Sequence, residues 1–68
     1  MKIQLLNVGR QKINKIIEVE NMEEAYQEVD YYLKSSSLEL HPVESDESLW
    51  DVVVGGFRIV GQLKVLEN

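Results

Sequence analysis

Apolar residues recur with a helical period in one stretch of the chain, residues 22–34. The positions that repeat at intervals of three and four are Met22, Ala25, Tyr26, Val29 and Leu33. This spacing places them on one stripe of an α-helix, with polar residues on the opposite side. Asn21 is a suitable N-cap, Glu24 follows it at capping-box spacing, and Lys34 complements the helix dipole in the last turn. We therefore predict a helix over residues 22–34.

The last third of the chain has the alternating pattern of a β-hairpin. Gly55 and Gly56 separate two apolar runs, and a pair of glycines favours a two-residue turn because both can adopt positive φ. That turn would pair Val54 with Phe57, Val52 with Ile59 and Trp50 with Gly61. All six residues would then lie on one face of the sheet, with the Trp50 ring covering the glycine.

The N-terminal residues predict a second hairpin. Apolar positions alternate before Gly9 at Ile3 and Leu5, and after it at Ile13, Ile17 and Val19. A three-residue loop over residues 8–10 makes both sets face the same way, and it pairs Leu5 with Ile13 and Ile3 with Lys15. Lys15 would then lie on the apolar face, which favours an edge strand from which its ammonium group reaches solvent.

Between the helix and the final hairpin, Leu38 and Leu40 alternate with polar residues. They indicate a short strand that ends at Pro42, and residues 44–48 then form an exposed acidic loop. The predicted order is β-β-α-β-β-β. This order is typical of an α+β two-layer sandwich, in which one helix covers one face of a mainly antiparallel five-stranded sheet.

One helix can cover only one face of such a sheet. The covered face would hold Ile3, Leu5, Ile13, Ile17, Trp50, Val52, Val54, Phe57, Ile59 and Leu63. The opposite face would hold Leu6, Val8, Ile16, Leu49, Val53, Val60 and Leu66. So many apolar side chains on an open face favour an interface, and a symmetric homodimer is the commonest closed assembly. The alternatives are a sheet that curls and buries both sides, or apolar residues that are simply scattered at the surface.

Length and composition exclude several classes of protein. A chain of 68 residues allows one domain, residues 1–68, with a small core that gains stability from association. The chain contains no cysteine, so a disulfide or a thiolate metal site is excluded. No apolar run is long enough for a membrane-spanning helix or a signal peptide. We expect a cytoplasmic protein without a membrane partner.

The charges are unevenly distributed along the chain. The formal net charge is −5, and residues 18–51 contain eleven acids and only one base, Lys34. The polar side of the predicted helix and the following loop contain Glu23, Glu24, Gln27, Glu28, Asp30, Tyr31, Glu44, Asp46 and Glu47. Such a surface suggests an alternative function, a small acidic inhibitor or nucleic-acid mimic of the phage or mobile-element type that docks on a basic partner groove. Otherwise this side of the helix is simply solvated.

Residues 41–47 contain the best candidates for chemistry. His41 is the only histidine, and Glu44, Asp46 and Glu47 follow it. Their spacing matches no EF-hand loop, so we predict a solvated loop and no catalytic, cofactor or metal site. Direct nucleic-acid binding is disfavoured because the chain is acidic and lacks an aromatic RNA-binding motif on a strand. The sequence therefore favours a non-enzymatic protein–protein interaction module.

Overall fold

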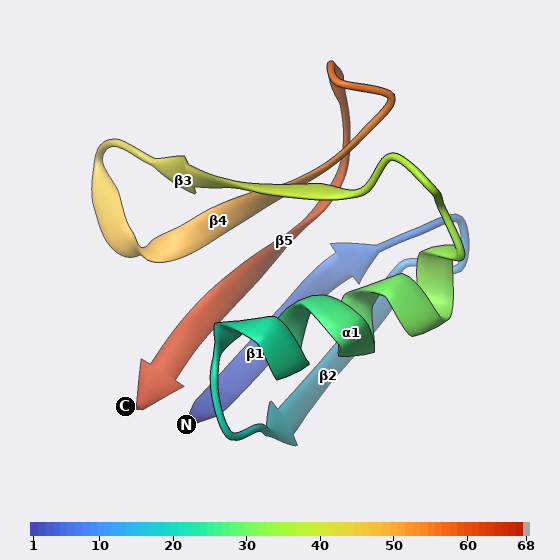
Figure 1. The fold of residues 1–68 in the computed structure, drawn as a ribbon. Coiled ribbons are helices and arrows are strands. Elements are labelled where there is room, and N and C mark those ends of the chain that lie inside the picture. The colour runs from blue at the N-terminus through green and yellow to red at the C-terminus, as the bar shows by residue number, and fades with distance from the viewer. Residues whose placement is uncertain (68) are drawn as a thin grey trace.

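The computed structural model describes residues 1–67 and has the predicted order of elements. The elements are β1 (Lys2–Val8), β2 (Ile13–Glu18), α1 (Met22–Leu33), β3 (Glu39–Val43), β4 (Asp46–Val54) and β5 (Arg58–Glu67). Within these residues the five strands form one sheet in the order β2-β1-β5-β4-β3, and every neighbouring pair is antiparallel. The predicted α+β two-layer sandwich is therefore confirmed (Figure 1).

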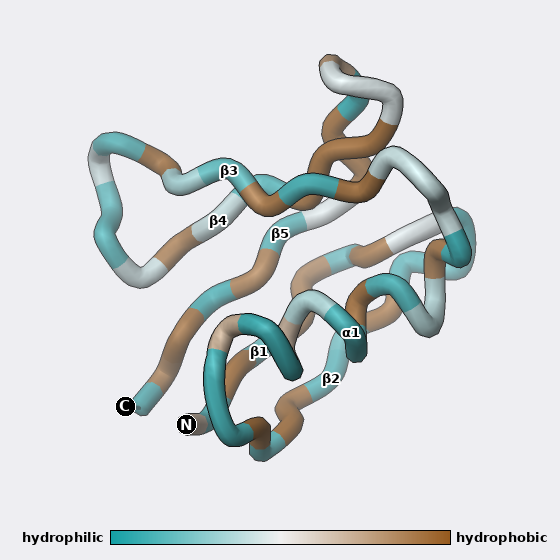
Figure 2. The backbone as a smooth tube through the Cα atoms, viewed as in Figure 1, coloured by the Kyte–Doolittle hydropathy of each residue, from teal (hydrophilic) through white to brown (hydrophobic). Residues whose placement is uncertain are grey.

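The single helix lies over β1 and β2, while the β3–β4 hairpin extends beyond it (Figure 1). The core between the two layers consists of Ile3, Leu5, Val8, Val19, Ala25, Val29, Leu38, Val52 and Leu63. Figure 2 shows hydrophobic and hydrophilic residues alternating along β5, as expected for a strand with one covered side. The helix thus covers the β1 side of the sheet more completely than the β4 side.

Local side-chain and backbone contacts define both ends of α1. The Asn21 side chain accepts a hydrogen bond from the Glu24 backbone N–H at 2.9 Å, which confirms the predicted N-cap. The helix ends at Leu33, one residue earlier than predicted, because Lys34 adopts a left-handed conformation with φ 51°. Its backbone N–H still donates to the Asp30 carbonyl at 2.6 Å. Lys34 therefore closes the helix as its C-cap.

The first hairpin has a different register from the one predicted. Leu5 pairs with Lys15 and Ile3 with Ile17, so the predicted pairs were wrong by two residues. The turn spans residues 9–12 instead of 8–10, and a β-bulge at Asn7, whose φ is 52°, adds a residue between Leu5 and Val8. Val8 consequently faces the helix and is fully buried in the core, so its predicted place on the opposite face was wrong.

Lys15 lies where the hydrophobic pattern placed it, on the helix side of the edge strand β2. Its Nζ donates a hydrogen bond to the Tyr32 hydroxyl at 3.0 Å and lies 5.7 Å from the centre of the Tyr32 ring. The side chain is exposed. An inward-pointing lysine is therefore tolerated at this edge because its ammonium group reaches both solvent and a polar partner.

The last hairpin also differs from its prediction, because it closes with three residues, 55–57, instead of two. Val54 pairs with Arg58, and beyond a bulge Val52 pairs with Gly61 and Trp50 with Leu63. Phe57 is therefore in the loop and 86% exposed, and Ile59 is 60% exposed. Their predicted places under the helix were wrong, as was the pairing of Trp50 with Gly61. Val60 packs against the core instead of lying on the opposite face.

The residues around Pro42 form a third hairpin that the sequence pattern did not indicate. Strand β3 continues through Pro42 to Val43, and Val43 pairs with Asp46 across a tight turn. Proline is tolerated because β3 is an edge strand. Most of the predicted acidic loop over residues 44–48 is thus the start of β4. No helix in the described part of the chain has the length and apolar character needed to cross a membrane.

Candidate interaction surfaces

The outer face of the sheet, the side opposite α1, is the surface on which an interface was predicted. One row of paired residues runs across four strands: Ile16, Gln4, Lys64 and Leu49. The neighbouring row contains Leu6, Gln62, Asp51 and His41. Among residues 1–67, no helix or further strand packs across these rows. The outer face is therefore open, with apolar residues toward its sides and polar residues between them.

The seven residues predicted to form an interface do not all lie on this surface. Ile16 is 58% exposed, Leu66 is 38% exposed, and Leu6 and Leu49 are half-buried. Val53 is only 3% exposed, although it does not belong to the core cluster. Val8 and Val60 pack in or against the core and cannot meet a partner on the outer face.

The structure adds one apolar residue to this surface, Ile59, which pairs with Val53. Alternation around a two-residue turn had assigned Ile59 to the covered face. The bulge between this pair and the pair Val52–Gly61 reverses that assignment. The hydrophobic pattern contains no signal for the position of this bulge.

Polar side chains in the middle of the outer face are already engaged with one another. The Gln62 amide donates to Asp51 at 3.0 Å, and Lys64 Nζ donates to Asp46 at 3.3 Å. Asp46 also accepts hydrogen bonds from the Ser48 hydroxyl at 2.7 Å and the Ser48 N–H at 2.9 Å. These two bonds, with a smaller contribution from Lys64, lower the pKa of Asp46. The Asp46 carboxylate is therefore already hydrogen-bonded within the chain, by Ser48 and Lys64.

The polar side of α1 is a second candidate surface. Glu23, Gln27 and Tyr31 are exposed, with Tyr31 at 68%, whereas Glu24, Glu28 and Asp30 are half-buried. The ring of Tyr31 meets that of Tyr32 edge to face, with centroids 5.2 Å apart. Four ion pairs form between residues 1 and 67, and none of them involves an acid of α1. The negative charge of the helix is therefore not neutralised by close contacts within the described chain.

One cation does lie near this acidic surface. The pKa of Lys15 is raised, chiefly by its hydrogen bond to the Tyr32 hydroxyl, with a smaller contribution from Glu28. Lys15 therefore remains charged beside the acids of the helix at neutral pH. It marks the edge of the negative surface, where the helix meets β2.

The candidate catalytic or metal-binding side chains of residues 41–47 do not form a cluster in the described structure. His41 Nε2 lies 2.6 Å from a carboxylate oxygen of Glu39 on the same strand, and Glu44 and Glu47 are exposed. Within residues 1–67, no three histidine, cysteine or acidic side chains are grouped closely enough to hold a metal ion. No polar or charged residue in that range is buried.

Comparisons with protein-family models, with curated proteins and with solved structures find no match.

Proposed function

We propose that the protein is a non-enzymatic interaction module that forms a homodimer through the outer face of its sheet. The observation that supports this proposal is the open position of Ile16, which is 58% exposed. Leu6 and Leu49 are half-buried on the same face. Packing a second copy against this face would remove these side chains from water, which is the main driving force of association.

Charge also favours a second copy as the partner for this face. Lys64 and Asp46 form one ion pair beside the β3–β4 turn, and Lys2 and Glu67 form another at the ends of β1 and β5. Two such faces can therefore meet without net repulsion. Two copies that met through the acidic side of α1 would instead place like charges together. A cytoplasmic location belongs to the same proposal and rests on the cysteine-free sequence.

Sedimentation velocity at micromolar concentration tests this function. The unmodified protein should sediment as a dimer, and Ile16→Lys should sediment as a folded monomer. Phe57→Lys is the matched control, because Phe57 is 86% exposed in the 55–57 loop and should leave the dimer intact. A monomer for the unmodified protein, or equal dissociation by both variants, would refute the proposed interface.

A second candidate function is an acidic inhibitor that docks α1 and the acids of the β3–β4 turn on a basic groove of a partner. The observation that favours it is that no acid of α1 takes part in an ion pair among the described residues. Such a groove would normally hold nucleic acid, whose phosphates the helix carboxylates would replace. Tyr31 would be the central contact, since exposed aromatic residues dominate binding energies.

Binding to immobilised poly-L-lysine, with double-stranded DNA as competitor, tests this second function. Neutralising Glu24, Glu28 and Asp30 together to their amides should weaken retention more than neutralising Glu18, Glu20 and Glu39. Both variants remove three negative charges, so the comparison separates a docking surface from net charge. Equal weakening by the two variants would show that only net charge matters and would reject the helix as a docking surface.

A further inference from the structure

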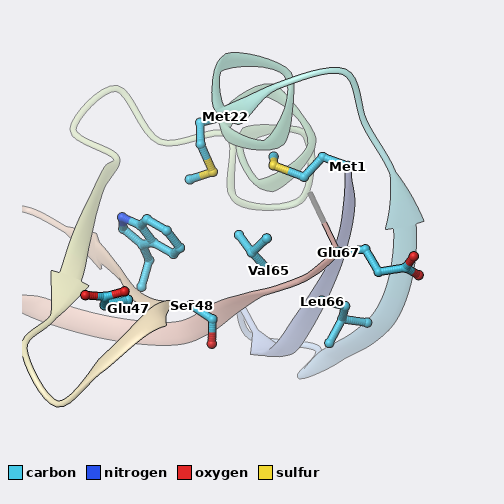
Figure 3. Close-up of a pocket in the computed structure, with 8 residues that line it drawn as sticks. Met1, Met22, Glu47, Ser48, Val65, Leu66 and Glu67 are labelled. Carbon is cyan, nitrogen blue, oxygen red and sulfur yellow. The ribbon is translucent and has the colours of Figure 1, made fainter.

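A groove opens on the helix side of the sheet, between the first turn of α1 and strands β4 and β5 (Figure 3). We call it the Trp50 groove, and its volume is about 330 Å³. It is lined by Met1, Met22, Glu47, Ser48, Trp50, Val65, Leu66 and Glu67. Figure 3 shows Met1, Met22 and Val65 directed toward one another from three segments of the chain. The groove is thus centred on the helix side of the sheet, and only its margin at the end of β5 approaches the outer face.

The groove exists because α1 does not cover the whole sheet. Trp50 pairs with Leu63, and Leu63 is fully buried in the core, so Trp50 belongs to the helix side. The helix packs on β1, three strands away from the edge strand β3. Trp50, Val65 and Met22 are consequently half-buried. Together they form an apolar surface that can still bury area against another molecule.

The side chains of this surface suit a protein segment. Met1 and Met22 are unbranched and adapt their shape to what they contact. A volume of about 330 Å³ lies at the lower end of the range for ligand pockets. It therefore fits one or two side chains of a peptide better than it fits a large cofactor.

The charge of the groove lining indicates what charge a bound protein segment would have. Two of the lining residues are acids, Glu47 and Glu67, and the Met1 ammonium group in the lining is paired with Glu18 at 3.3 Å. Glu67 is likewise paired with Lys2 at 3.1 Å. Glu47 lines the groove, is exposed and takes part in none of the ion pairs among residues 1–67. A lysine or arginine would be attracted to this rim, and it would also interact favourably with the face of the Trp50 indole.

We propose that the Trp50 groove binds a segment of a partner protein in which an apolar side chain is flanked by lysine or arginine. The apolar side chain enters between Trp50, Val65 and Met22, and the cations of the segment lie along the acidic rim. This site is separate from the centre of the proposed homodimer interface, because Trp50, Val65 and Met22 pack against the core on the helix side of the sheet, whereas Ile16, Leu6 and Leu49 lie on the outer face.

Trp50 is the only tryptophan, so its fluorescence reports directly on the groove. The probe is a synthetic hexapeptide of alternating leucine and arginine. It should shift the Trp50 emission to shorter wavelength with a saturable dependence on concentration. Replacing its arginines by glutamate, or its leucines by serine, should remove the shift. No saturable shift at millimolar peptide, or an equal shift with the glutamate peptide, would overturn the proposal.

Two variants of the protein test whether the peptide binds in the groove. Glu47→Lys should weaken the peptide about tenfold, which corresponds to about 1.4 kcal/mol. Glu44→Lys makes the same change in net charge at an exposed residue that does not line the groove, so it should leave the affinity nearly unchanged. Equal weakening by both variants would overturn the groove as the site. Sedimentation of Glu47→Lys should match that of the unmodified protein, which separates this result from loss of the homodimer.

Discussion

Gly61 lies directly against the backbone of Val8. A Cβ atom built on Gly61 would lie only 2.7 Å from Val8 Cα and 2.9 Å from the Asn7 carbonyl oxygen. This close approach joins two irregular positions, the bulge of β1 at Asn7 and the bulge of β5 before Gly61. Next to it, the Gly9 N–H donates to the Val60 carbonyl at 2.8 Å. The contact therefore lies where β1 and β5 both change which of their side chains face the core.

We expect Gly61→Ala to destabilise the protein by roughly 2–4 kcal/mol, because it combines overpacking with backbone strain. The φ of Gly61 is +148°, and the nearest neighbours of the added methyl group are backbone atoms that cannot rotate away. Gly56→Ala is the matched control, since Gly56 also has positive φ but has no neighbour within 4 Å. It should cost only about 1–2 kcal/mol. Urea unfolding of both variants measures the difference, and equal losses would contradict the importance of the Val8 contact.

Asn21→Ala should destabilise the protein by about 1 kcal/mol, because it removes the N-cap of α1. The Glu24 N–H would lose its acceptor at 2.9 Å and depend on water instead. Asn21→Asp keeps a side-chain oxygen in the same place and should restore most of the loss. Thermal unfolding followed by circular dichroism compares the three proteins. If the alanine and aspartate variants melt together, the cap does not stabilise the helix.

Tyr26→Phe should cost about 0.5–1.5 kcal/mol, the typical contribution of one hydrogen bond. The Tyr26 hydroxyl donates to the Leu38 carbonyl at 2.9 Å and so ties α1 to the segment that leads into β3. Tyr31→Phe is the control, because Tyr31 is 68% exposed and a surface change of this kind usually alters stability by less than about 0.5 kcal/mol. Urea unfolding distinguishes them. A loss with Tyr31→Phe as large as that with Tyr26→Phe would argue against a specific role for this bond.

The pH dependence of stability should change in Ser48→Ala. The hydrogen bonds from Ser48 lower the pKa of Asp46 in the folded protein, whereas the unfolded value is about 3.9. The stabilisation is therefore complete above the unfolded pKa and is lost as the pH falls through the folded pKa. Removing the hydroxyl should raise the pKa of Asp46 toward its ordinary value. The free energy of unfolding should then decrease less steeply as the pH falls below the unfolded pKa.

Carboxyl titration by NMR measures the pKa of Asp46 directly in this variant. Ser45→Ala is the control, because Ser45 lies in the adjacent turn and forms no hydrogen bond with Asp46 among the described contacts. An Asp46 pKa that is the same in all three proteins would show that Ser48 does not act on this carboxylate.

The candidate surfaces were only partly visible in the amino-acid pattern. The acidic side of α1 followed from helical spacing alone, since neighbours on a helix are set by residues three and four apart. The outer face was harder, because each bulge moves every later residue of its strand to the other side. Ile16 and Leu49 were assigned to that face, whereas Val8, Val60 and Ile59 were misplaced for this reason. The Trp50 groove had no local signal, since its lining comes from four separate segments.

The helix from Met22 to Leu33, its Asn21 cap and the succession of helix and strands along the chain could be read from the sequence itself, because they depend on interactions between near neighbours. Strand order and register could not, because they depend on contacts between distant residues such as Val8 and Gly61. The residues around Asn7 do not indicate its left-handed conformation. That conformation is seen only in the structure, where β1 pairs with both β2 and β5. Short-range patterns therefore define the elements of this protein, and long-range packing decides which of their side chains remain available for binding.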